Sequence, residues 1–249
     1  MRQGLVRFIL LVIVLLLIFG VYRLLTIDPI DAGTFFNPDA GPLVLVEPEG
    51  GDAAPLTLAA FQAAAAGGAT GFYTPVSLAQ NGELVAAAAA ETSDDASGQV
   101  VSLDQLLTEF PDARFAVELR EPSLQSLAAL LHTADTHNAR GRLLALVDDQ
   151  QLVETLRQQA PDLATALTSG ETSTFLTVSR FGLAPFYRPV ASGLILPAEQ
   201  FSARTARSAQ SGGMAVLVVA PQESDDPLSW IEQGADGVII GRSQAAQPD

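Results

Sequence analysis

Eight short apolar runs recur along the chain beyond residue 42, and their spacing constrains the fold more than any other feature. Each has four to six residues, as in LVLV, RFAVEL and GVII. Runs of this length between polar stretches are typical of buried β-strands. The predicted strands are residues 43–46, 70–74, 114–119, 142–147, 164–168, 193–196, 215–220 and 237–240.

The stretches between these runs have the composition of helices. Examples are LTLAAFQAAAA, SLQSLAALLHTADTHN and QQLVETLRQQA, while GGATGFY, SGGMAVLVV and GADGVII each place glycine just before a strand. Glycine commonly ends helices, and regular alternation of strand and helix is typical of parallel α/β folds. We therefore expect an α/β fold, a (β/α)8 TIM barrel over residues 42–243, with residues 83–90 as a hairpin arm after Asn81-Gly82. An open doubly wound sheet is the alternative, but no GxGxxG follows the first strand.

Residues 5–25, LVRFILLVIVLLLIFGVYRLL, form a long apolar stretch with charges only at Arg7 and Arg23. About 20 such residues cross the roughly 30 Å hydrocarbon core of a bilayer as a helix. Arginines near the ends of a span reach the headgroups with their long side chains. A cleaved secretory signal is the alternative, but no small-x-small cleavage site follows. We expect a retained transmembrane anchor within residues 1–26.

Charges on the two sides of this stretch predict its orientation. Arg2 precedes the stretch and Arg7 lies near its start, whereas Asp28, Asp31 and Asp39 follow Arg23. The positive-inside rule then places the N-terminus in the cytoplasm. We expect a single-pass membrane protein whose linker, residues 27–41, and barrel lie on the outer side, periplasmic or extracellular. Residues 244–249 form a short tail.

Composition excludes several chemistries. All 13 basic residues are arginine and cysteine is absent, which removes lysine Schiff bases, P-loop lysines, thiol nucleophiles and disulfides. Beyond residue 26 the chain carries 10 arginines and all 28 acidic residues, a formal charge of −18. Because such a surface repels polyphosphate, we expect no nucleic-acid partner.

Several blocks, taken in order, resemble the glycerophosphodiester phosphodiesterase family. LVLVEPEGG, APLTLAAFQAAAAGGATGFYTP and VSLAQNGELVAAAA follow the hydrophobic pattern of that family's first units. SLDQLLTEFPDARFAVELRE is similar to its helix before a Glu-Ile-Lys strand, and ASGLILP, SGGMAVLVV and SWIEQGADGVII are similar to its last units. The resemblance covers the predicted barrel and implies a TIM-barrel phosphodiesterase ancestry.

Most of that family's chemistry does not carry over. The family uses a divalent metal held by carboxylates and two histidines as general acid and base. The resemblance places the first histidine on Glu47, its neighbouring arginine on Pro48 and the second histidine near Ala88. It places the paired metal carboxylates on Tyr73 and Pro75, which offer no ligand set for a hard cation.

Glu118 in VELR keeps a functional position of the family, with Arg120 after it in place of lysine. An unpaired carboxylate at the end of a buried strand is costly. We therefore expect Glu118 to have a partner, which is Arg120, another arginine or a bound ion, and we favour an ion pair. Tyr73 and Arg120 are further candidates for the barrel mouth.

Glu47, Glu49 and Glu118 could together hold a calcium or magnesium ion at the mouth. We instead expect Glu47 and Glu49, in a proline-bracketed loop, to face solvent. His132 and His137, the only histidines, are five residues apart in a predicted helix and so lie on different faces. We expect both to be ordinary helix residues rather than catalysts or metal ligands.

These observations predict a membrane-anchored, glycerophosphodiester phosphodiesterase-like barrel without metal-dependent hydrolytic activity, which binds a small molecule or protein or serves as a scaffold. No cofactor is expected. The alternative is a divergent phosphodiesterase that hydrolyses glycerophosphodiesters or related phospholipid-derived substrates, with calcium or magnesium at Glu47, Glu49 and Glu118. Whether the chain is an enzyme is left open by the sequence.

Overall fold

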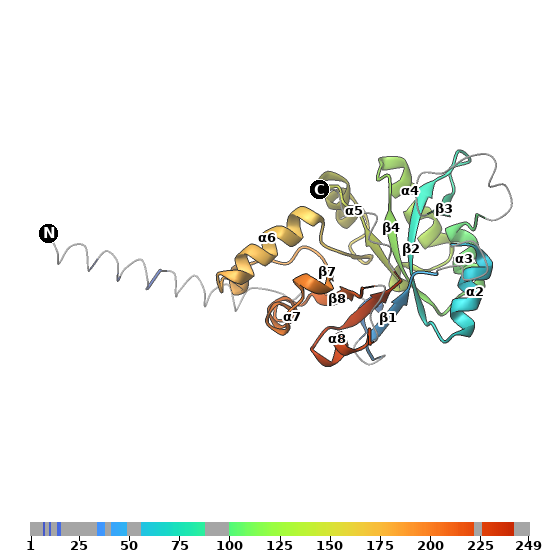
Figure 1. Cartoon of the computed structure of the whole chain (residues 1–249). Helices are drawn as coiled ribbons and strands as arrows, with labels where there is room; N and C mark the ends of the chain where they lie inside the picture. The colour runs from blue at the N-terminus through green and yellow to red at the C-terminus, as the bar shows by residue number, and fades with distance from the viewer. Residues whose placement is uncertain are drawn as a thin grey trace.

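The structure is a computed structural model, and it describes residues 34–37, 41–48, 56–87, 100–221 and 226–241, together with residues 7, 10, 14 and 15. Strands and helices alternate along this part of the chain (Figure 1). The barrel strands are β1 (Leu43–Val46), β2 (Gly71–Leu78), β4 (Arg114–Leu119), β5 (Leu143–Leu146), β6 (Ala164–Thr165), β7 (Gly193–Pro197), β8 (Ala215–Val219) and β9 (Gly237–Ile240). The helices are α2 (Leu58–Ala66), α3 (Leu103–Glu109), α4 (Leu124–Thr136), α5 (Gln150–Gln159), α6 (Ser169–Arg180), α7 (Ala203–Gln210) and α8 (Ser229–Glu232). Shorter elements are β3 (Leu84–Ala86) and the 3-10 turns η1 (Thr34–Phe36), η4 (Arg140–Arg142), η5 (Ala184–Phe186) and η6 (Ala198–Gln200).

The barrel strands pair in the order β6-β5-β4-β2-β1-β9-β8-β7, and every pairing along this path is parallel. A parallel bridge between Ala166 and Gly193 joins β6 to β7, and the Leu167 amide donates to the Gly193 carbonyl at 2.9 Å. The sheet is therefore a nearly closed eight-stranded barrel, as predicted. β3 pairs antiparallel with β2 across the Asn81-Gly82 turn, which confirms the predicted hairpin.

The barrel interior is filled by alternate side chains of its strands. Leu43 and Leu45 of β1 point inward, and the next residue of that alternation is Glu47. The interior cluster comprises Phe35, Leu43, Leu45, Tyr73, Ala116, Leu144, Ala164, Ala166, Leu217 and Ile239. This layer is a packed core rather than a pore, as in other barrels of eight parallel strands.

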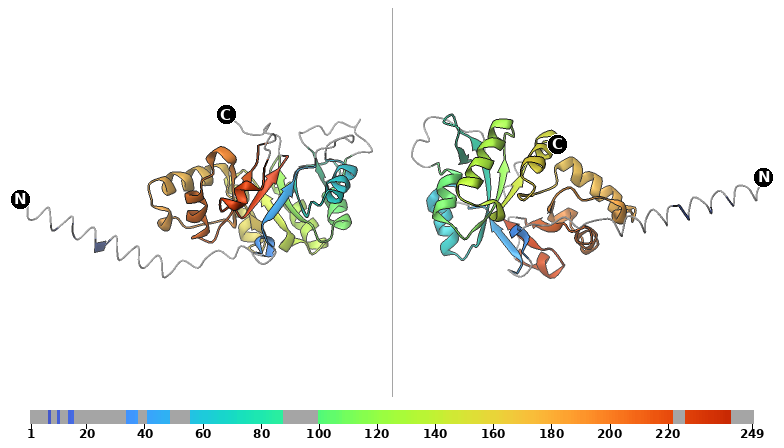
Figure 2. Two further views of the ribbon diagram at one scale, coloured as in Figure 1. Left: turned by 60° about the horizontal axis from the view of Figure 1, so that its bottom comes forward. Right: turned by 180° about the vertical axis from the view of Figure 1, so that it is seen from behind.

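The helices form two groups around the barrel. In Figure 1, α2, α3 and α4 lie on one side and α6 and α7 on the other, and Figure 2 shows the same separation from two further directions. The first group packs on a large apolar cluster that includes Phe61, Phe72 and Leu130. A separate cluster that includes Phe175, Leu194 and Ala206 holds α6 and α7 against β7. The apolar contacts that hold α6 are therefore separate from those that hold α2, α3 and α4.

The N-terminal end of the barrel is covered by η1. Phe35 is 1% exposed and belongs to the interior cluster. The ring of Phe36 lies against the start of β7, since a Cβ added at Gly193 would stand 3.0 Å from its Cζ. The chain thus enters the barrel at the end where the strands begin.

All eight predicted strands are present, but β6 is shorter than predicted and α6 was not among the helices read from the sequence. The run at 164–168 ends early because Thr168 is the N-cap of α6, and its Oγ1 accepts a hydrogen bond from the Glu171 amide. Glu171 in turn accepts from the Thr168 amide, which completes a capping box. α6 was not predicted because its sequence is rich in threonine and serine, which are weak helix formers.

The predicted anchor lies almost wholly outside the described residues, which include only Arg7, Leu10, Val14 and Leu15 of it. Among the residues that the structure describes, no helix has the length and apolar character needed to cross a bilayer. Most of the predicted linker and the tail over 244–249 also lie outside the described part.

Candidate functional site

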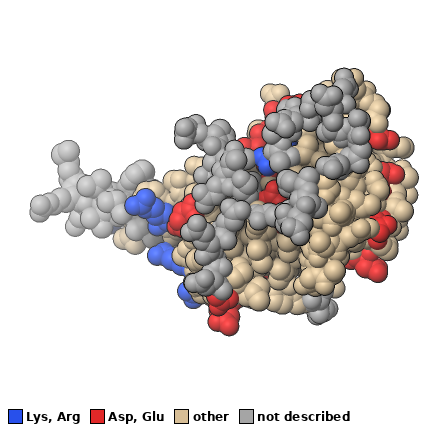
Figure 3. All heavy atoms as spheres, turned by 45° about the vertical axis from the view of Figure 1, so that its right-hand side comes forward, with Lys and Arg blue, Asp and Glu red and all other residues tan. Residues whose placement is uncertain are grey.

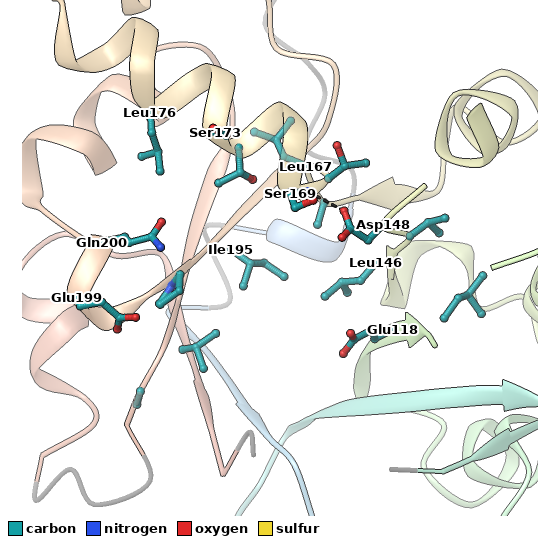
Figure 4. Close-up of a pocket in the computed structure, with 18 of the residues that line it drawn as sticks. Glu118, Leu146, Asp148, Leu167, Ser169, Ser173, Leu176, Ile195, Glu199 and Gln200 are labelled. Atoms are coloured by element: carbon teal, nitrogen blue, oxygen red, sulfur yellow. Dashed lines mark hydrogen bonds between the residues drawn. The ribbon is translucent and has the colours of Figure 1, made fainter. Parts of the chain in front are cut away.

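A cavity of about 590 Å³ opens where β4 to β8 end, between the barrel and α6 (Figure 4). The C-terminal ends of the strands are the end at which TIM barrels carry their functional sites. Three surfaces meet here: the first turns of α6, the residues just after β5 and β7, and the last interior positions of β4 and β8. We take this cavity as the candidate functional site.

One wall of the cavity is a row of hydroxyl groups on α6. Ser169, Thr172, Ser173, Leu176 and Thr177 line it, and their spacing places them on one helical face. Figure 4 shows Ser173 and Leu176 directed from the helix toward the cavity. The wall can therefore offer several hydroxyl donors and acceptors beside one apolar contact.

Three carboxylates from different elements also line the cavity. Glu118 comes from β4, Asp148 follows β5 and Glu199 lies in η6. Figure 4 shows them on different sides, with Ile195 and Leu146 between them. Among the described residues that line the cavity, none is arginine, lysine or histidine. Its described walls therefore combine negative charge, hydroxyl groups and an apolar floor.

Glu118 forms the predicted ion pair. Its Oε1 lies 3.5 Å from Nη1 of Arg120, and each side chain is 18% exposed. Glu118 and Arg120 are two residues apart, so in an extended backbone both side chains lie on the same face of the sheet. Arg120 thus offsets part of the charge that Glu118 presents to the cavity.

Protein carboxylates already occupy the start of α6. Asp148 Oδ1 accepts from the Ser169 amide at 2.7 Å, and Glu171 Oε2 accepts from the Thr168 amide at 2.9 Å. The free amides at a helix N-terminus form a common phosphate-binding site. Here two of these amides are satisfied from within the chain, so this end of the cavity is poorly suited to a further anion.

Arg157 fixes Glu171 in this arrangement. Its guanidinium donates to both carboxylate oxygens of Glu171, at 2.7 and 3.0 Å, and also to Thr165 Oγ1 and the Ala166 carbonyl. Burial alone would raise the pKa of the Glu171 carboxyl, but the hydrogen bonds from Arg157 and the Thr168 amide hold that pKa below its ordinary value. Glu171 is therefore a permanent anion at neutral pH.

The predicted mouth residues lie in different places. Glu118 lines the cavity, whereas Tyr73 is fully buried in the interior cluster below it and Arg120 reaches it only through Glu118. Glu47 was expected to face solvent but is only 8% exposed, because it continues the inward alternation of β1. Glu49 and Ala88 lie outside the described residues.

The residues at the family's metal positions do not fit a divalent cation. Tyr73 is enclosed by apolar neighbours, Pro75 has no ligand atom in its side chain, and Glu118 is paired with Arg120. Within the described ranges, no group of three His, Asp or Glu side chains could hold a metal ion. The three cavity carboxylates are dispersed around the walls rather than gathered on one point.

The two histidines lie away from the cavity. His132 is exposed on α4, and His137 follows that helix, where its Nε2 lies 2.8 Å from Asp104 Oδ1. This contact ties the end of α4 to α3. Neither residue lines the cavity.

Sequence reasoning missed Asp148, Glu199 and the hydroxyl row of α6. Asp148 and Glu199 follow two correctly predicted strands, so the rule that barrel sites form at the strand ends could have identified them. The hydroxyl row needed α6 to be recognised first. The pattern Thr-x-x-Glu at 168–171 was the available signal.

Solved structures that superimpose on this chain include several glycerophosphodiester phosphodiesterases. The enzyme from Agrobacterium tumefaciens superimposes with a TM-score of 0.63 at 14% identity, covering 81% of this chain and 97% of that one. The enzyme from Thermotoga maritima gives a TM-score of 0.60 at 16% identity, covering 80% and 94%. A phosphodiesterase from Oleispira antarctica, in complex with the product sn-glycerol-3-phosphate, gives 0.62 at 15% identity, covering 80% and 92%.

No family model matches the sequence, and no curated protein with a similar sequence was found. The structural likeness, at this low identity, establishes the fold. The chain shares the fold of glycerophosphodiester phosphodiesterases, as its sequence blocks implied.

Proposed function

We propose that this chain is a divergent member of the glycerophosphodiester phosphodiesterase family, anchored by residues 5–25, whose barrel binds a small molecule without metal-dependent hydrolysis. The single observation that carries the proposal is the changed chemistry of the barrel mouth. Tyr73 and Pro75 replace the metal carboxylates implied by the resemblance, while a large cavity remains at the C-terminal ends of β4 to β8. The scaffold persists and the reactive groups do not.

The cavity walls favour an uncharged or cationic hydroxylated ligand. Glu118, Asp148 and Glu199 contribute negative charge, and Ser173 and Thr172 contribute hydroxyl groups. A phosphate group would meet carboxylates where it usually meets helix amides, since Asp148 already accepts from Ser169. We therefore place amino alcohols and amino sugars ahead of phosphodiesters as ligands.

Hydrolysis is the direct test of this proposal. The purified full chain, incubated with glycerophosphocholine and calcium or magnesium, is expected to release no glycerol phosphate above a protein-free control. Turnover that a chelator abolishes, and that Glu118→Gln abolishes while Glu232→Gln does not, would show that the chain is an enzyme. Glu232 is a matched control because it is exposed on α8 and does not line the cavity.

Metal binding separates the proposal from the alternative of a divergent phosphodiesterase. That alternative needs an ion held by carboxylates such as Glu47, Glu49 and Glu118, and hard cations require several oxygen ligands. Calorimetric titration of the full chain with calcium and with magnesium at millimolar concentration should give no binding heat. Heat that Glu118→Gln removes would favour the enzyme.

Ligand binding is tested by filling the cavity. Glucosamine, ethanolamine and sn-glycerol-3-phosphate serve as probes in thermal unfolding of the full chain. The amines are expected to raise the melting temperature, by linkage, and the phosphate is not. Ser173→Leu should remove the effect because Ser173 faces the cavity, whereas Thr174→Leu, on the same helix but outside it, should not. If only sn-glycerol-3-phosphate raised the melting temperature, the cavity would bind anionic rather than amine ligands.

A further inference from the structure

An apolar segment between α6 and β7 is exposed to an unusual degree. Phe181 is 74% exposed, Leu183 48%, Phe186 38% and Val190 45%. Large apolar side chains grouped in this way on a surface mark an interaction site more often than isolated ones do. We call residues 180–190, RFGLAPFYRPV, the apolar segment.

Arginines accompany the apolar segment. Arg180 and Arg188 lie within it, and Arg207 lies in the last turn of α7, which ends beside it because Gly212 approaches Pro189 closely. All three are exposed, and none makes an ion pair with the rest of the described chain.

Some of the other arginines of the barrel are paired within the protein. Arg120, Arg140 and Arg157 each pair with a carboxylate. On the face drawn in Figure 3, most visible basic side chains lie together toward one end, while acidic ones are spread over the rest. The formal charge of −18 is therefore an average that does not describe the surface around the apolar segment.

The apolar segment lies at the end of the barrel where the chain enters. It leads into the start of β7, so it belongs to the end at which the strands begin. η1 lies at the same end, because Phe36 packs against Gly193 at the first residue of β7. Only residues 27–33 separate η1 from the anchor, a span of at most about 25 Å when fully extended. The anchor thus holds this end of the barrel close to the bilayer.

We propose that the apolar segment docks the barrel on the surface of an anionic bilayer, with Phe181, Leu183 and Phe186 in the interfacial region and Arg180 and Arg188 against the headgroups. Aromatic and aliphatic side chains flanked by arginine are suited to this boundary. Charges beyond the Debye length of about 8 Å are screened at physiological salt, so distant carboxylates do not prevent the contact.

Two carboxylates at the same end are engaged by protein donors. Asp162 accepts from Arg140 at 2.7 Å, and Asp236 accepts from the Val216 amide and from Gln210. Arg180 and Arg188 are exposed and form no ion pair within the described chain, so they remain available to lipid phosphates. Docking would orient the barrel with its cavity directed away from the membrane, because the cavity lies at the opposite ends of the strands.

The absence of cysteine allows a direct test, because a single introduced cysteine can be labelled uniquely. Full chains carrying Phe186→Cys or Gln80→Cys are labelled with an environment-sensitive dye. They are inserted into nanodiscs of phosphatidylcholine alone or mixed with phosphatidylserine. Gln80 is the control, since it is exposed in the turn after β2 at the other end of the barrel.

The dye at position 186 should shift to shorter wavelength and be quenched by surface nitroxide lipids in the anionic discs, and the dye at position 80 should not. Raising salt from about 0.1 M to about 1 M should reverse the shift, because the Debye length falls from about 10 to about 3 Å. Arg180→Gln with Arg188→Gln should lower the ratio of docked to undocked barrel about thirty-fold.

Equal behaviour of the two dyes in anionic discs would refute docking. Because docking rests in part on the proposed anchor, co-migration of the chain with the discs is scored separately. If the chain does not stay with the discs, the anchor is wrong. The labelled chain is then mixed with vesicles of the same two compositions, where the position-186 shift still decides whether the surface binds.

Discussion

Arg157 is the residue that joins the second half of the barrel to its candidate site. It donates to Glu171, Thr165 and the Ala166 carbonyl, and so ties α5 to the end of β6 and to the first turn of α6. Its side chain is 15% exposed and that of Glu171 is 10% exposed. A charge buried to this extent is stable only with its partner present. The position of the α6 hydroxyl row therefore depends on this pair.

Glu171→Gln is expected to lower the free energy of unfolding by about 2 kcal/mol at pH 7, because hydrogen bonds to charged groups contribute about that much. The pKa of Glu171 is lowered from an ordinary value of 4.5. Its contribution is therefore full above about pH 4.5 and is lost as the pH falls through the folded-state pKa. Denaturant unfolding of both proteins at pH 7 and at pH 3 measures the difference.

The control for this prediction is Glu154→Gln. Glu154 is exposed on α5 and accepts only from Gln150 in the described part of the chain. It should change stability by less than about 0.5 kcal/mol at either pH. A Glu171→Gln difference that is the same at pH 3 as at pH 7 would contradict the role assigned to its charge.

Residue-level prediction from the sequence was right for Glu118, where the cost of an unpaired buried carboxylate decided the outcome, and wrong for Glu47, where the alternation of β1 was overlooked. Glu118 was expected to pair, and Arg120, just after the end of β4, provides the partner. Glu47 was assigned to solvent because prolines surround it, but the inward alternation of β1 continues through it. Asp148 and Glu199 look in sequence like ordinary capping or loop residues. Their place around one cavity depends on α6.

At the scale of elements, the close approach of β9 to β1 fixes the seam between the last strand and the first. Gly237 pairs with Leu43, and a Cβ at Gly237 would lie only 2.3 Å from the Leu43 carbonyl oxygen. No side-chain rotation relieves a clash with a backbone atom. β9 was predictable as a strand because GVII is an apolar run. The sequence did not show that the first residue of this strand must be glycine.

Gly237→Ala is therefore expected to destabilise the barrel by about 1–3 kcal/mol through overpacking. Gly170→Ala, the same chemical change at another position, is expected to have the opposite effect on stability. Gly170 lies in α6 with a negative φ and only Thr168 Oγ1 within 4 Å, so alanine should stabilise the helix by about 0.5–1 kcal/mol. Chemical unfolding of the two variants beside the unchanged protein measures both, and a neutral Gly237→Ala would mean that the β1–β9 seam can open.

Element prediction was strongest for strands and weakest for polar helices. Strands buried on both faces are continuous apolar runs, which is why all eight were located before the structure. α6 has six threonines and serines and only three large apolar residues, a composition that also suits a loop. The helix exists because a capping box starts it and Phe175 anchors it, and the latter is a tertiary contact.

At the scale of the whole molecule, the fold places the apolar segment and the candidate cavity at opposite ends of the barrel. The chain enters at the end covered by η1, near the apolar segment, and the cavity opens at the opposite end. A barrel anchored in this way presents its cavity to the surrounding solution. The formal charge of −18 beyond residue 26 predicts repulsion of polyphosphate, but it does not describe how the arginines are distributed over the surface.

The barrel is predicted to lie on the outer side of the membrane. Arg2 and Arg7 should keep the N-terminus in the cytoplasm, and the stretch at 5–25 should remain in the bilayer because no suitable cleavage site follows it. Protease added to spheroplasts should digest the barrel and leave a membrane-bound stub. Replacing Arg2 and Arg7 with Glu should weaken this orientation, whereas replacing Arg180 and Arg188, far from the stretch, should not. A reporter fused after Asp249 that is active only in the cytoplasm would contradict the topology, and so would a soluble mature chain beginning near residue 27.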